Sequence, residues 1–510
     1  MNTNQNTYRR PAPRTWKERL LQGGSGRPLT LRQERTVPEW IVGNSVLTFF
    51  IALILCTIGF GYTMEMNLML VSSISVLFFY YGTKAASASW AQTKEREFIK
   101  NVFVVALLIR IGWVLFSYLY FNELIFGKNN GYGDDTGWYM EFSKDIAQWI
   151  KDGMTYPFSA LIKKNAAAMD DVGYPITLAL EYLLSSESSD VFIPMLIKSV
   201  INAYCVLCIY HIAKRHFGES VARLAAIFVA FNPLMFFWCS SLLKEAEMMF
   251  LCCLSLDLVD KTLSSGSKLT FKSLLPGLIV GLALFFYRAP LAIVLFLAMF
   301  AHIVMASGRV MSFAKKMIAG TMVFVTLLIG YGDQFLSQTE SLVQTAQSDE
   351  QSNNMAWRTS RDGGNAFAKY AGASVFAPLI FTIPFPTFNI ALEDQYLQRE
   401  LSGAYFIKNV YSFFVLYVMI ILLISGDWRK HVFILAYTLG YLMSLVLSSF
   451  AQSGRFHMPV WPMLIMFAAY GIQLGKTTPR IRRWYTTALV IEVIACLAWN
   501  WFKLKGRGMI

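Results

Sequence analysis

Charged residues are scarce in this chain of 510 residues. Asp, Glu, Lys and Arg make up 15% of the sequence and hydrophobic residues 55%, whereas roughly a quarter of an average soluble domain is charged. A soluble protein this apolar could not cover its own surface, so the composition excludes a water-soluble enzyme, a disordered regulator and a fibrous protein. Apolar runs of roughly 20 residues, the length that crosses a bilayer core, recur along the chain and predict a polytopic membrane protein.

The motifs of several enzyme classes are absent as well. The sequence has no Walker A loop, no GxSxG, no HExxH, no dinucleotide fingerprint after a usable strand, and only five histidines. Its seven cysteines lie in or beside apolar runs, and Cys205 and Cys208 are one turn apart on a predicted spanning helix, so no disulfide framework, redox site or zinc site is expected. The net charge is +13, but the basic residues do not form one patch, so no nucleic-acid partner is expected.

Thirteen apolar runs indicate an all-α polytopic fold with about 13 transmembrane helices. The run at 274–287 is short for a full span and fits a tilted or re-entrant piece. The runs lie near 41–62, 66–83, 101–122, 191–213, 221–239, 246–262, 274–287, 289–307, 315–331, 405–425, 431–450, 457–474 and 485–502.

The basic residues between the runs orient these helices. With the N-terminal tail in the cytoplasm, every basic cluster between runs falls on the cytoplasmic side, as the positive-inside rule requires. No cleaved signal peptide is expected, and an odd number of helices places the C-terminal tail on the other side. We divide the chain into a basic cytoplasmic tail (1–40), an additional transmembrane hairpin (41–100), a core (101–475), and a last helix with its tail (476–510).

Two connections, 123–190 and 332–404, are too long to be turns, and both fall on the non-cytoplasmic face. The first contains an amphipathic pattern with Phe142, Ile146 and Trp149 on one side, which predicts an interfacial helix lying on the membrane. The second is polar at first and then apolar and proline-rich. Long ordered loops usually carry function, so the chemistry is expected on the external side.

Asp134 and Asp135 are the strongest candidates for chemistry. They follow glycines just past the third run, and Tyr139 lies four residues after Asp135, so Asp135 and Tyr139 share one face of a helix that begins here. A carboxylate in this place could accept a proton from an acceptor hydroxyl or help to hold a divalent cation. The alternative is that one aspartate only caps the helix.

Other charged residues lie at predicted external helix ends. Lys244 and Glu245 follow the fifth run, and the alternative for them is a surface ion pair of little energetic value. Arg288 separates two runs and could bind a phosphate through two hydrogen bonds. Alternatively, its side chain extends to the membrane interface. Arg455 precedes a helix N-terminus, where the helix dipole favours an anion. Arg110 and Lys198 lie inside runs, where charge is costly, and neither is assigned to catalysis.

Several of these patterns together resemble the GT-C glycosyltransferases that use polyprenyl-phosphate sugars, the relatives of protein mannosyltransferases and of aminoarabinose transferases. The family's Gly-Asp-x-x-x-Tyr pattern matches here with Asp135 four residues before Tyr139, and Asp134 stands in the more variable preceding place. The resemblance covers about 100–475. Its other motifs are Gly173-Tyr-Pro175, Phe231-Asn-Pro233 followed by Ser240–Glu245, and the helix start Ser453-Gly-Arg-Phe-His-Met-Pro459.

The resemblance implies transfer of a sugar from a lipid-linked donor, with inversion, to a glycan, lipid or protein acceptor at the external face of a membrane, expected to be the bacterial cytoplasmic membrane. An external site has no access to cytosolic nucleotide sugars, which favours a lipid-linked donor. Asp135 would be the general base, supported by Asp134. The other implied roles are acceptor or metal positioning by Glu245 and Tyr139, and donor phosphate binding by Lys244, Arg288 and Arg455.

Three further residues are candidates for donor or acceptor contacts. Arg358 and Arg361 lie in the second external loop, and His457 follows Arg455. Phe456 and His457 replace the residues that are commoner in the family, so the resemblance does not support a role for His457. No cofactor is certain; if the enzyme uses a divalent cation such as Mg²⁺ or Mn²⁺, its ligands would come from Asp134, Asp135 and Glu245.

Two other kinds of protein fit the composition. An O-antigen polymerase or ligase also has many spans and a large external loop, but it would depend on arginine and histidine rather than on an early aspartate pair. A transporter or flippase of lipids or glycans would be expected to show internal repeats with paired broken helices, and no such repeat is visible, although Pro233, Pro276 and Pro290 could break helices.

Overall fold

The protein is described here by a computed structural model. The structure describes residues 29–60, 66–120, 133–165, 171–184, 191–264, 271–305, 386, 388, 402–447 and 454–505. The predicted run at 315–331, most of the second long connection with Arg358 and Arg361, and the side chain of Asp134 lie outside the described residues.

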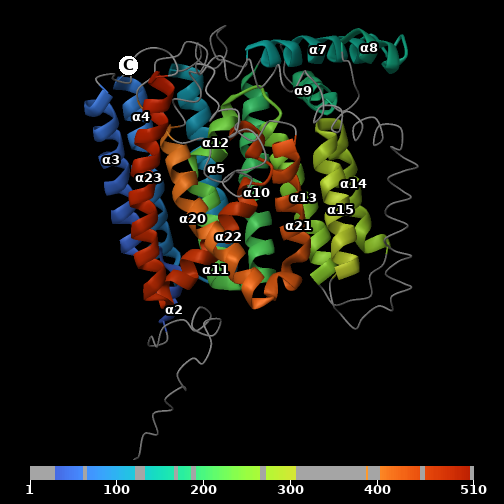
Figure 1. Ribbon diagram of the computed structural model, residues 1–510. Coiled ribbons are helices and arrows are strands. Elements are labelled where there is room, and N and C mark those ends of the chain that lie inside the picture. The colour runs from blue at the N-terminus through green and yellow to red at the C-terminus, as the bar shows by residue number, and fades with distance from the viewer. Residues whose placement is uncertain are drawn as a thin grey trace, which may run out of the picture.

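The described residues form a bundle of helices without a strand among them, as Figure 1 shows. Short 3-10 helices η2 (Trp238–Ser240), η5 (Asp427–His431) and η6 (Gly454–His457) connect some of the longer elements. The α-helices are α2 (Leu31–Arg35), α3 (Glu39–Phe60), α4 (Met66–Trp90), α5 (Glu95–Tyr120), α7 (Gly133–Lys151), α8 (Phe158–Asn165), α9 (Gly173–Leu184), α10 (Phe192–Phe217), α11 (Glu219–Phe231), α12 (Pro233–Phe237), α13 (Glu245–Ser264), α14 (Phe271–Tyr287), α15 (Ala289–Met305), α20 (Ser402–Ser425), α21 (Val432–Leu447), α22 (Trp461–Thr477) and α23 (Pro479–Lys505).

Helices cover every predicted apolar run that falls within the described residues. Among the described residues, five helical stretches are long and apolar enough to cross a bilayer, and α11 with α12 and η2 forms a sixth candidate that is bent by 49°. The all-α membrane fold is therefore confirmed, while the number of thirteen spans remains a prediction. The five stretches are Leu31–Phe60, Met69–Trp90, Glu95–Tyr120, Phe192–Phe217 and Ser402–Ser425.

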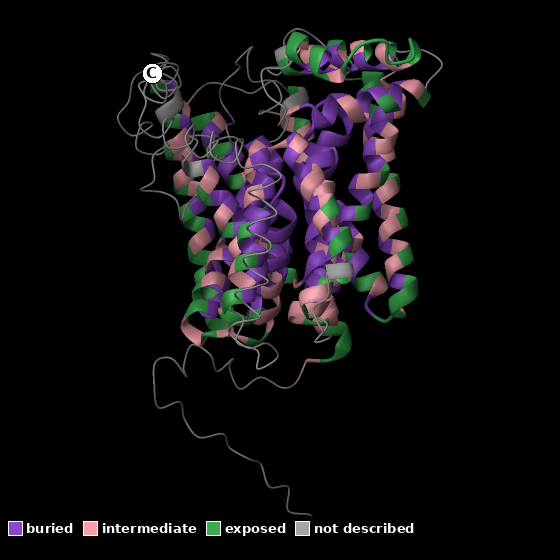
Figure 2. Cartoon of the chain, turned by 90° about the vertical axis from the view of Figure 1, so that its right-hand side faces the viewer, coloured by how far each residue is buried: buried purple, intermediate pink, exposed green. Residues whose placement is uncertain are grey.

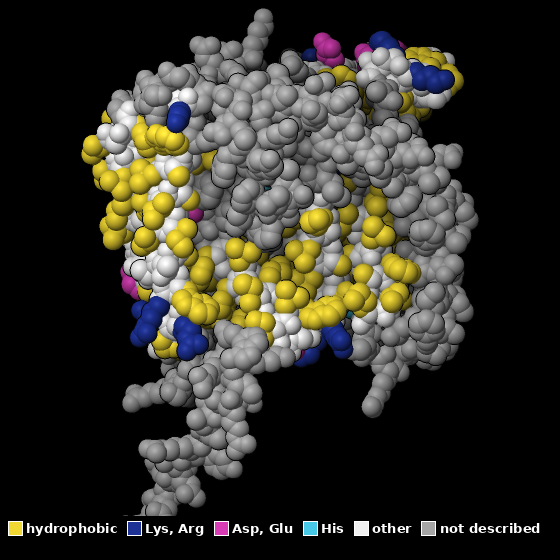
Figure 3. Space-filling view, viewed as in Figure 1, with side chains coloured by type: hydrophobic (Ala, Val, Ile, Leu, Met, Phe, Trp, Pro, Cys, Tyr) yellow, Lys and Arg dark blue, Asp and Glu magenta, His cyan; other side chains and the backbone are white. Residues whose placement is uncertain are grey.

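The basic connecting segments meet at one end of the bundle. Lys84 pairs with Glu39, and Lys214 pairs with Glu95 at 2.5 Å, so segments expected on the same side of the membrane are in contact. Figure 3 shows Lys and Arg side chains at this lower end, below a broad apolar surface, and others at the upper end. The last helix, α23, runs to the opposite end (Figure 1), where an odd number of spans would place the C-terminus.

Helices α7 and α8 lie across the other end of the bundle, almost perpendicular to the long helices (Figure 1). The amphipathic helix predicted in this connection is present, but its apolar face packs within the protein. Phe142 and Ile146 are each 1% exposed and belong to a cluster with residues of α8 and α9. Figure 2 shows buried positions on the inner side of these two helices and exposed positions on their outer side.

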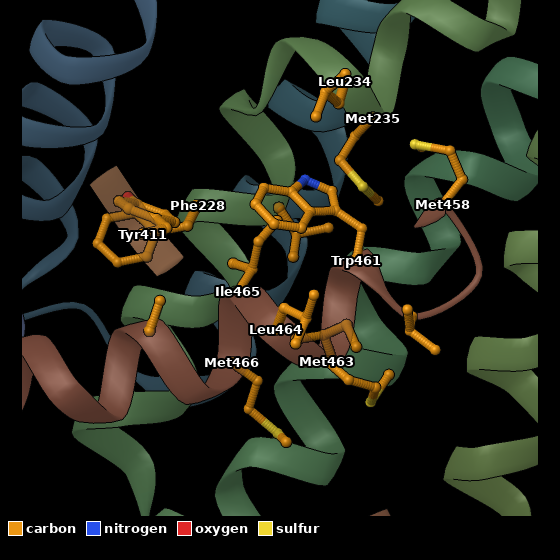
Figure 4. Close-up of a cluster of buried hydrophobic side chains, with 14 of the residues drawn as sticks. Phe228, Leu234, Met235, Tyr411, Met458, Trp461, Met463, Leu464, Ile465 and Met466 are labelled. Atoms are coloured by element: carbon orange, nitrogen blue, oxygen red, sulfur yellow. The ribbon is translucent and has the colours of Figure 1, made fainter. Parts of the chain in front are cut away.

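The helical backbone between α10 and α13 is broken at Asn232 and Pro233, where α11 ends and α12 begins. The Asn232 side chain accepts a hydrogen bond from the backbone N–H of Leu234 at 3.0 Å, so it caps α12, whose first residue is proline. The Trp461 indole donates to the same Asn232 oxygen at 3.3 Å. Figure 4 shows the Trp461 ring packed beside Met235 and other apolar side chains, so the break lies inside the core.

Arg110 explains how the bundle tolerates this break. The C-terminal carbonyls of α11 have no helical partner once the proline ends the helix. The guanidinium of Arg110 is fully buried and donates to the carbonyl oxygens of Ala230 at 3.2 Å and Val229 at 3.3 Å, and to the Asn202 side chain at 2.6 Å. Arg110, the charged residue inside the third apolar run, thus binds backbone carbonyls at the end of α11.

Candidate active site

The predicted site residues come together at the end of the bundle that carries α7. Asp135 lies in the first turn of α7, Glu245 begins α13, and Arg455 lies in η6. Lys244 directly precedes α13, and Arg288 lies between α14 and α15. Segments more than 300 residues apart in the sequence therefore meet here, since Asp135 and Arg455 are separated by 320 positions.

Arg455 is the centre of this group. Its Nη1 donates to Asp135 Oδ2 at 2.8 Å, and its Nε donates to Glu245 Oε1. Glu245 is fully buried, and the Arg455 side chain is 5% exposed, whereas the Asp135 side chain is 52% exposed. Burial lowers the pKa of Arg455, but the two carboxylates outweigh that effect and raise it above its ordinary value. Arg455 is therefore a fixed cation that orients one buried and one accessible carboxylate.

Lys244 is also held by a carboxylate, one that the sequence did not single out. Its Nζ contacts Asp171 Oδ1 and donates to the backbone carbonyl of Tyr287 at 3.1 Å. Lys244 is 7% exposed, so the alternative of a surface ion pair between Lys244 and Glu245 is wrong: both are buried, and each has a different partner.

Tyr139 lies between these two groups of charges. Its hydroxyl donates a long hydrogen bond of 3.5 Å to Asp171, and the ammonium of Lys244 lies 6.0 Å from the centre of its ring. Burial raises the pKa of Tyr139, and the negative charge of Asp171 raises it further. The phenol is therefore neutral and acts as a hydrogen-bond donor to Asp171.

Arg288 and His457 complete the described part of the constellation. The Arg288 guanidinium stacks on the ring of Phe456, 4.1 Å from its centre, and Arg455 lies 5.4 Å from the centre of the same ring. His457 is buried, with its Nδ1 2.7 Å from Nζ of Lys408. Phe456 therefore contacts two guanidinium groups through one aromatic ring, while His457 contacts Lys408 of α20.

A divalent cation does not fit the described carboxylates. Asp135 and Glu245, two of the three residues named as ligands for such an ion, both bind the guanidinium of Arg455, which lies between them. No group of three or more His, Cys, Asp or Glu side chains suited to a metal occurs within the described ranges, from which the Asp134 side chain is excluded.

Two more residues lie near the site. Asp171 is not predicted from the sequence, and Lys198 is visible in the sequence but has no predicted role. Asp171 stands two residues before the Gly173-Tyr-Pro175 element, and an acidic residue at this distance from a family motif was the available signal. In the sequence, Lys198 stands out only as a charge inside an apolar run. It is fully buried and 3.4 Å from Glu247.

One of the comparisons with known proteins gives a match. Residues 153–332 match the Alg9-like mannosyltransferase family, a family of GT-C-type glycosyltransferases that use lipid-linked sugars. The match covers roughly a third of the chain, including Asp171, Lys244 and Arg288, but neither Asp135 nor Arg455. No curated protein and no solved structure matches the chain. The family match confirms the predicted resemblance to membrane glycosyltransferases of the GT-C type.

Proposed function

We propose that this protein transfers a sugar from a polyprenyl-phosphate donor to an acceptor hydroxyl, with inversion, at the membrane face where α7 lies. The name of the matching family favours mannose as the sugar. One observation carries the proposal: a half-exposed carboxylate, Asp135, is held by a buried arginine in a group of cations that suits a phosphate headgroup. The distribution of basic residues supports the external face as the side on which this end lies.

The chemistry follows from the two kinds of charge. The acceptor oxygen attacks the anomeric carbon and gives its proton to Asp135, while the bond between that carbon and the phosphate oxygen breaks. The electron pair stays on the phosphate, whose added negative charge is stabilised by Arg288, Lys244 and Arg455. A single displacement of this kind inverts the anomeric carbon, and it needs no covalent intermediate because a phosphate departs readily.

Asp135 is suited to the role of base by its geometry. Its bond to Arg455 fixes the orientation of the carboxylate, and its exposure leaves room for an acceptor. Glu245 has the opposite environment, fully buried behind Arg455, so it holds the arginine rather than receiving a proton from an acceptor. The two carboxylates thus have different roles because one is accessible and the other is not.

The test compares Asp135→Asn with Asp145→Asn in purified full-length protein. Both aspartates lie on α7, but Asp145 pairs with Lys164 at the exposed side of the helix. With a radiolabelled polyprenyl-phosphate mannose and a membrane extract as acceptor, Asp135→Asn is expected to lower transfer by about 10²–10⁴-fold, with donor binding retained. Asp145→Asn should transfer at the wild-type rate.

Unchanged transfer by Asp135→Asn would reject the base assignment, and it is the result expected of a polymerase or ligase that works through arginine and histidine. Donor binding without any transfer by the wild-type protein would instead favour a lipid transporter.

A further inference from the structure

The backbone between α11 and α13 is irregular inside the bundle. It passes through α12 and η2, and then through the non-helical residues Ser241–Lys244 before α13 begins at Glu245. Inside a membrane protein, such backbone is tolerated only where it is buried in protein or lines a water-filled cavity, because its carbonyls and N–H groups must find partners. The irregular segment leads directly to two residues of the candidate site, Lys244 and Glu245.

Polar side chains from α5 and α10 bind the carbonyl oxygens along this path. Each of these side chains lies in a predicted apolar run, and each donates to at least one backbone carbonyl oxygen of the irregular path. The contacts are Arg110 to Val229 and Ala230, Asn202 to Met235 at 2.8 Å, Trp113 to Phe237 at 3.2 Å, and Lys198 to Ser241 and Leu243 at 2.7 Å each.

Lys198 is the member of this set nearest to the candidate site. Its ammonium is fully buried and donates to the carbonyls of Ser241 and Leu243 and to the hydroxyl of Tyr174 at 2.8 Å. Glu247 supplies a negative charge at 3.4 Å. The three hydrogen bonds use the three protons of the ammonium.

These bonds reach both sides of the contact between Lys244 and Asp171. Leu243 directly precedes Lys244, and Tyr174 follows Asp171 by three residues. One ammonium therefore fixes the backbone next to the cation and the helix start next to its carboxylate partner. A shift of about 1 Å in a group that binds the reacting atoms can lower a rate by about 10²-fold.

We propose that Lys198 is a positioning residue for the transfer reaction: it sets the Ser241–Glu245 segment against the start of α9, and thereby the positions of Lys244 and Glu245. This inference rests on the proposed function for its kinetic consequence, but the positioning itself is a property of the fold that can be measured without activity.

The first measurement is hydrogen exchange of backbone amides in the full-length protein in detergent. Lys198→Met removes the ammonium and keeps the length of the side chain; the companion variant Lys198→Met/Glu247→Gln also removes the buried carboxylate that would be left without its cation. Faster exchange is expected across 241–249, with unchanged exchange in α5 and α20. The matched control is Lys214→Met on the same helix, whose lysine pairs with Glu95 at the opposite end of the bundle.

The second measurement is a double-mutant cycle on transfer. Alone, Lys198→Met/Glu247→Gln is expected to lower kcat/KM for the polyprenyl-phosphate mannose donor by about 10²-fold. In a Lys244→Ala, Glu245→Gln background, the same change should lower it by less than about 3-fold, because the groups that Lys198 positions are already gone. A merely structural role for Lys198 would lower the rate by the same factor in both backgrounds.

The inference is overturned by unchanged hydrogen exchange at 241–249 in both Lys198 variants, or by additive kinetic effects. If wild-type protein transfers no sugar from this donor, the proposed function fails; the exchange measurement then still decides whether Lys198 sets the segment. The two failures are thus distinguishable.

Discussion

Replacing Arg455 by methionine is the perturbation whose cost is best defined by the structure. Arg455→Met keeps most of the side-chain volume but removes the cation from Glu245, which is fully buried, and from Asp135, which is half exposed. Glu245 then remains as a buried carboxylate that has lost its cation. We expect both stability and transfer to be lost, for separable reasons.

The magnitude comes almost entirely from Glu245. Breaking a buried ion pair by removing one partner costs about 3–5 kcal/mol, because the remaining charge is uncompensated. An exposed pair such as that with Asp135 contributes about 1 kcal/mol or less. The free energy of unfolding should therefore fall by about 3–5 kcal/mol in Arg455→Met, and by no more than about 1 kcal/mol in Asp135→Asn.

Denaturant unfolding in detergent micelles measures both values. The double variant Arg455→Met/Glu245→Gln removes the stranded charge and is expected to regain most of the lost stability, while its transfer stays low because Asp135 is no longer oriented. A loss below about 1 kcal/mol in Arg455→Met, or no recovery in the double variant, would refute the view that Arg455 compensates a buried Glu245.

Two further changes test the neighbourhood of α9. A Cβ added by Gly173→Ala would lie 2.6 Å from the ring of Tyr287 and 2.9 Å from the carbonyl oxygen of Phe286, so we expect a lower melting temperature and weaker transfer; a wild-type melting curve would contradict this packing. Burial raises the pKa of Glu181 from 4.5 to about 8, with Glu247 adding to the shift, so the folded protein binds this proton more tightly than the unfolded chain. The resulting stability is full below about pH 4.5 and is lost as the pH rises through 8. Thermal unfolding between pH 5 and pH 9 should show Glu181→Gln gaining stability over wild type as the pH rises, and a pH-independent difference would contradict the burial of this carboxyl.

The helices were predictable because the bilayer imposes a length and a composition on each of them. The apolar runs within the described residues all became helices, and the proline at Pro233 marked the break between α11 and α12. The amphipathic pattern around Phe142 correctly predicted a helix, but a pattern cannot tell whether its apolar face meets lipid or protein. Here it meets α8 and α9.

The sequence predicted the site residues that belong to a motif. It did not predict the roles of residues that depend on a tertiary contact. Asp135, Glu245 and Arg455 were singled out separately, and the structure joins them. The partner of Lys244 is Asp171, 73 positions away, and no local pattern indicates that pairing. Lys198 was visible as a costly charge, but its partners are backbone carbonyls of a segment more than 40 positions later, which have no signature in the sequence.

The long sequence separation within the Arg455 group has a consequence for how the protein is made. Glu245 enters the membrane long before Arg455, which follows it by 210 positions, is synthesised. During that interval the nascent chain holds an acidic side chain without its cation, and the ribosome must complete most of the remaining chain before the two can meet. A polypeptide that ends before η6 would lack the cation that compensates Glu245, so the buried contact between α13 and η6 can form only after the segment that carries Arg455 has been synthesised.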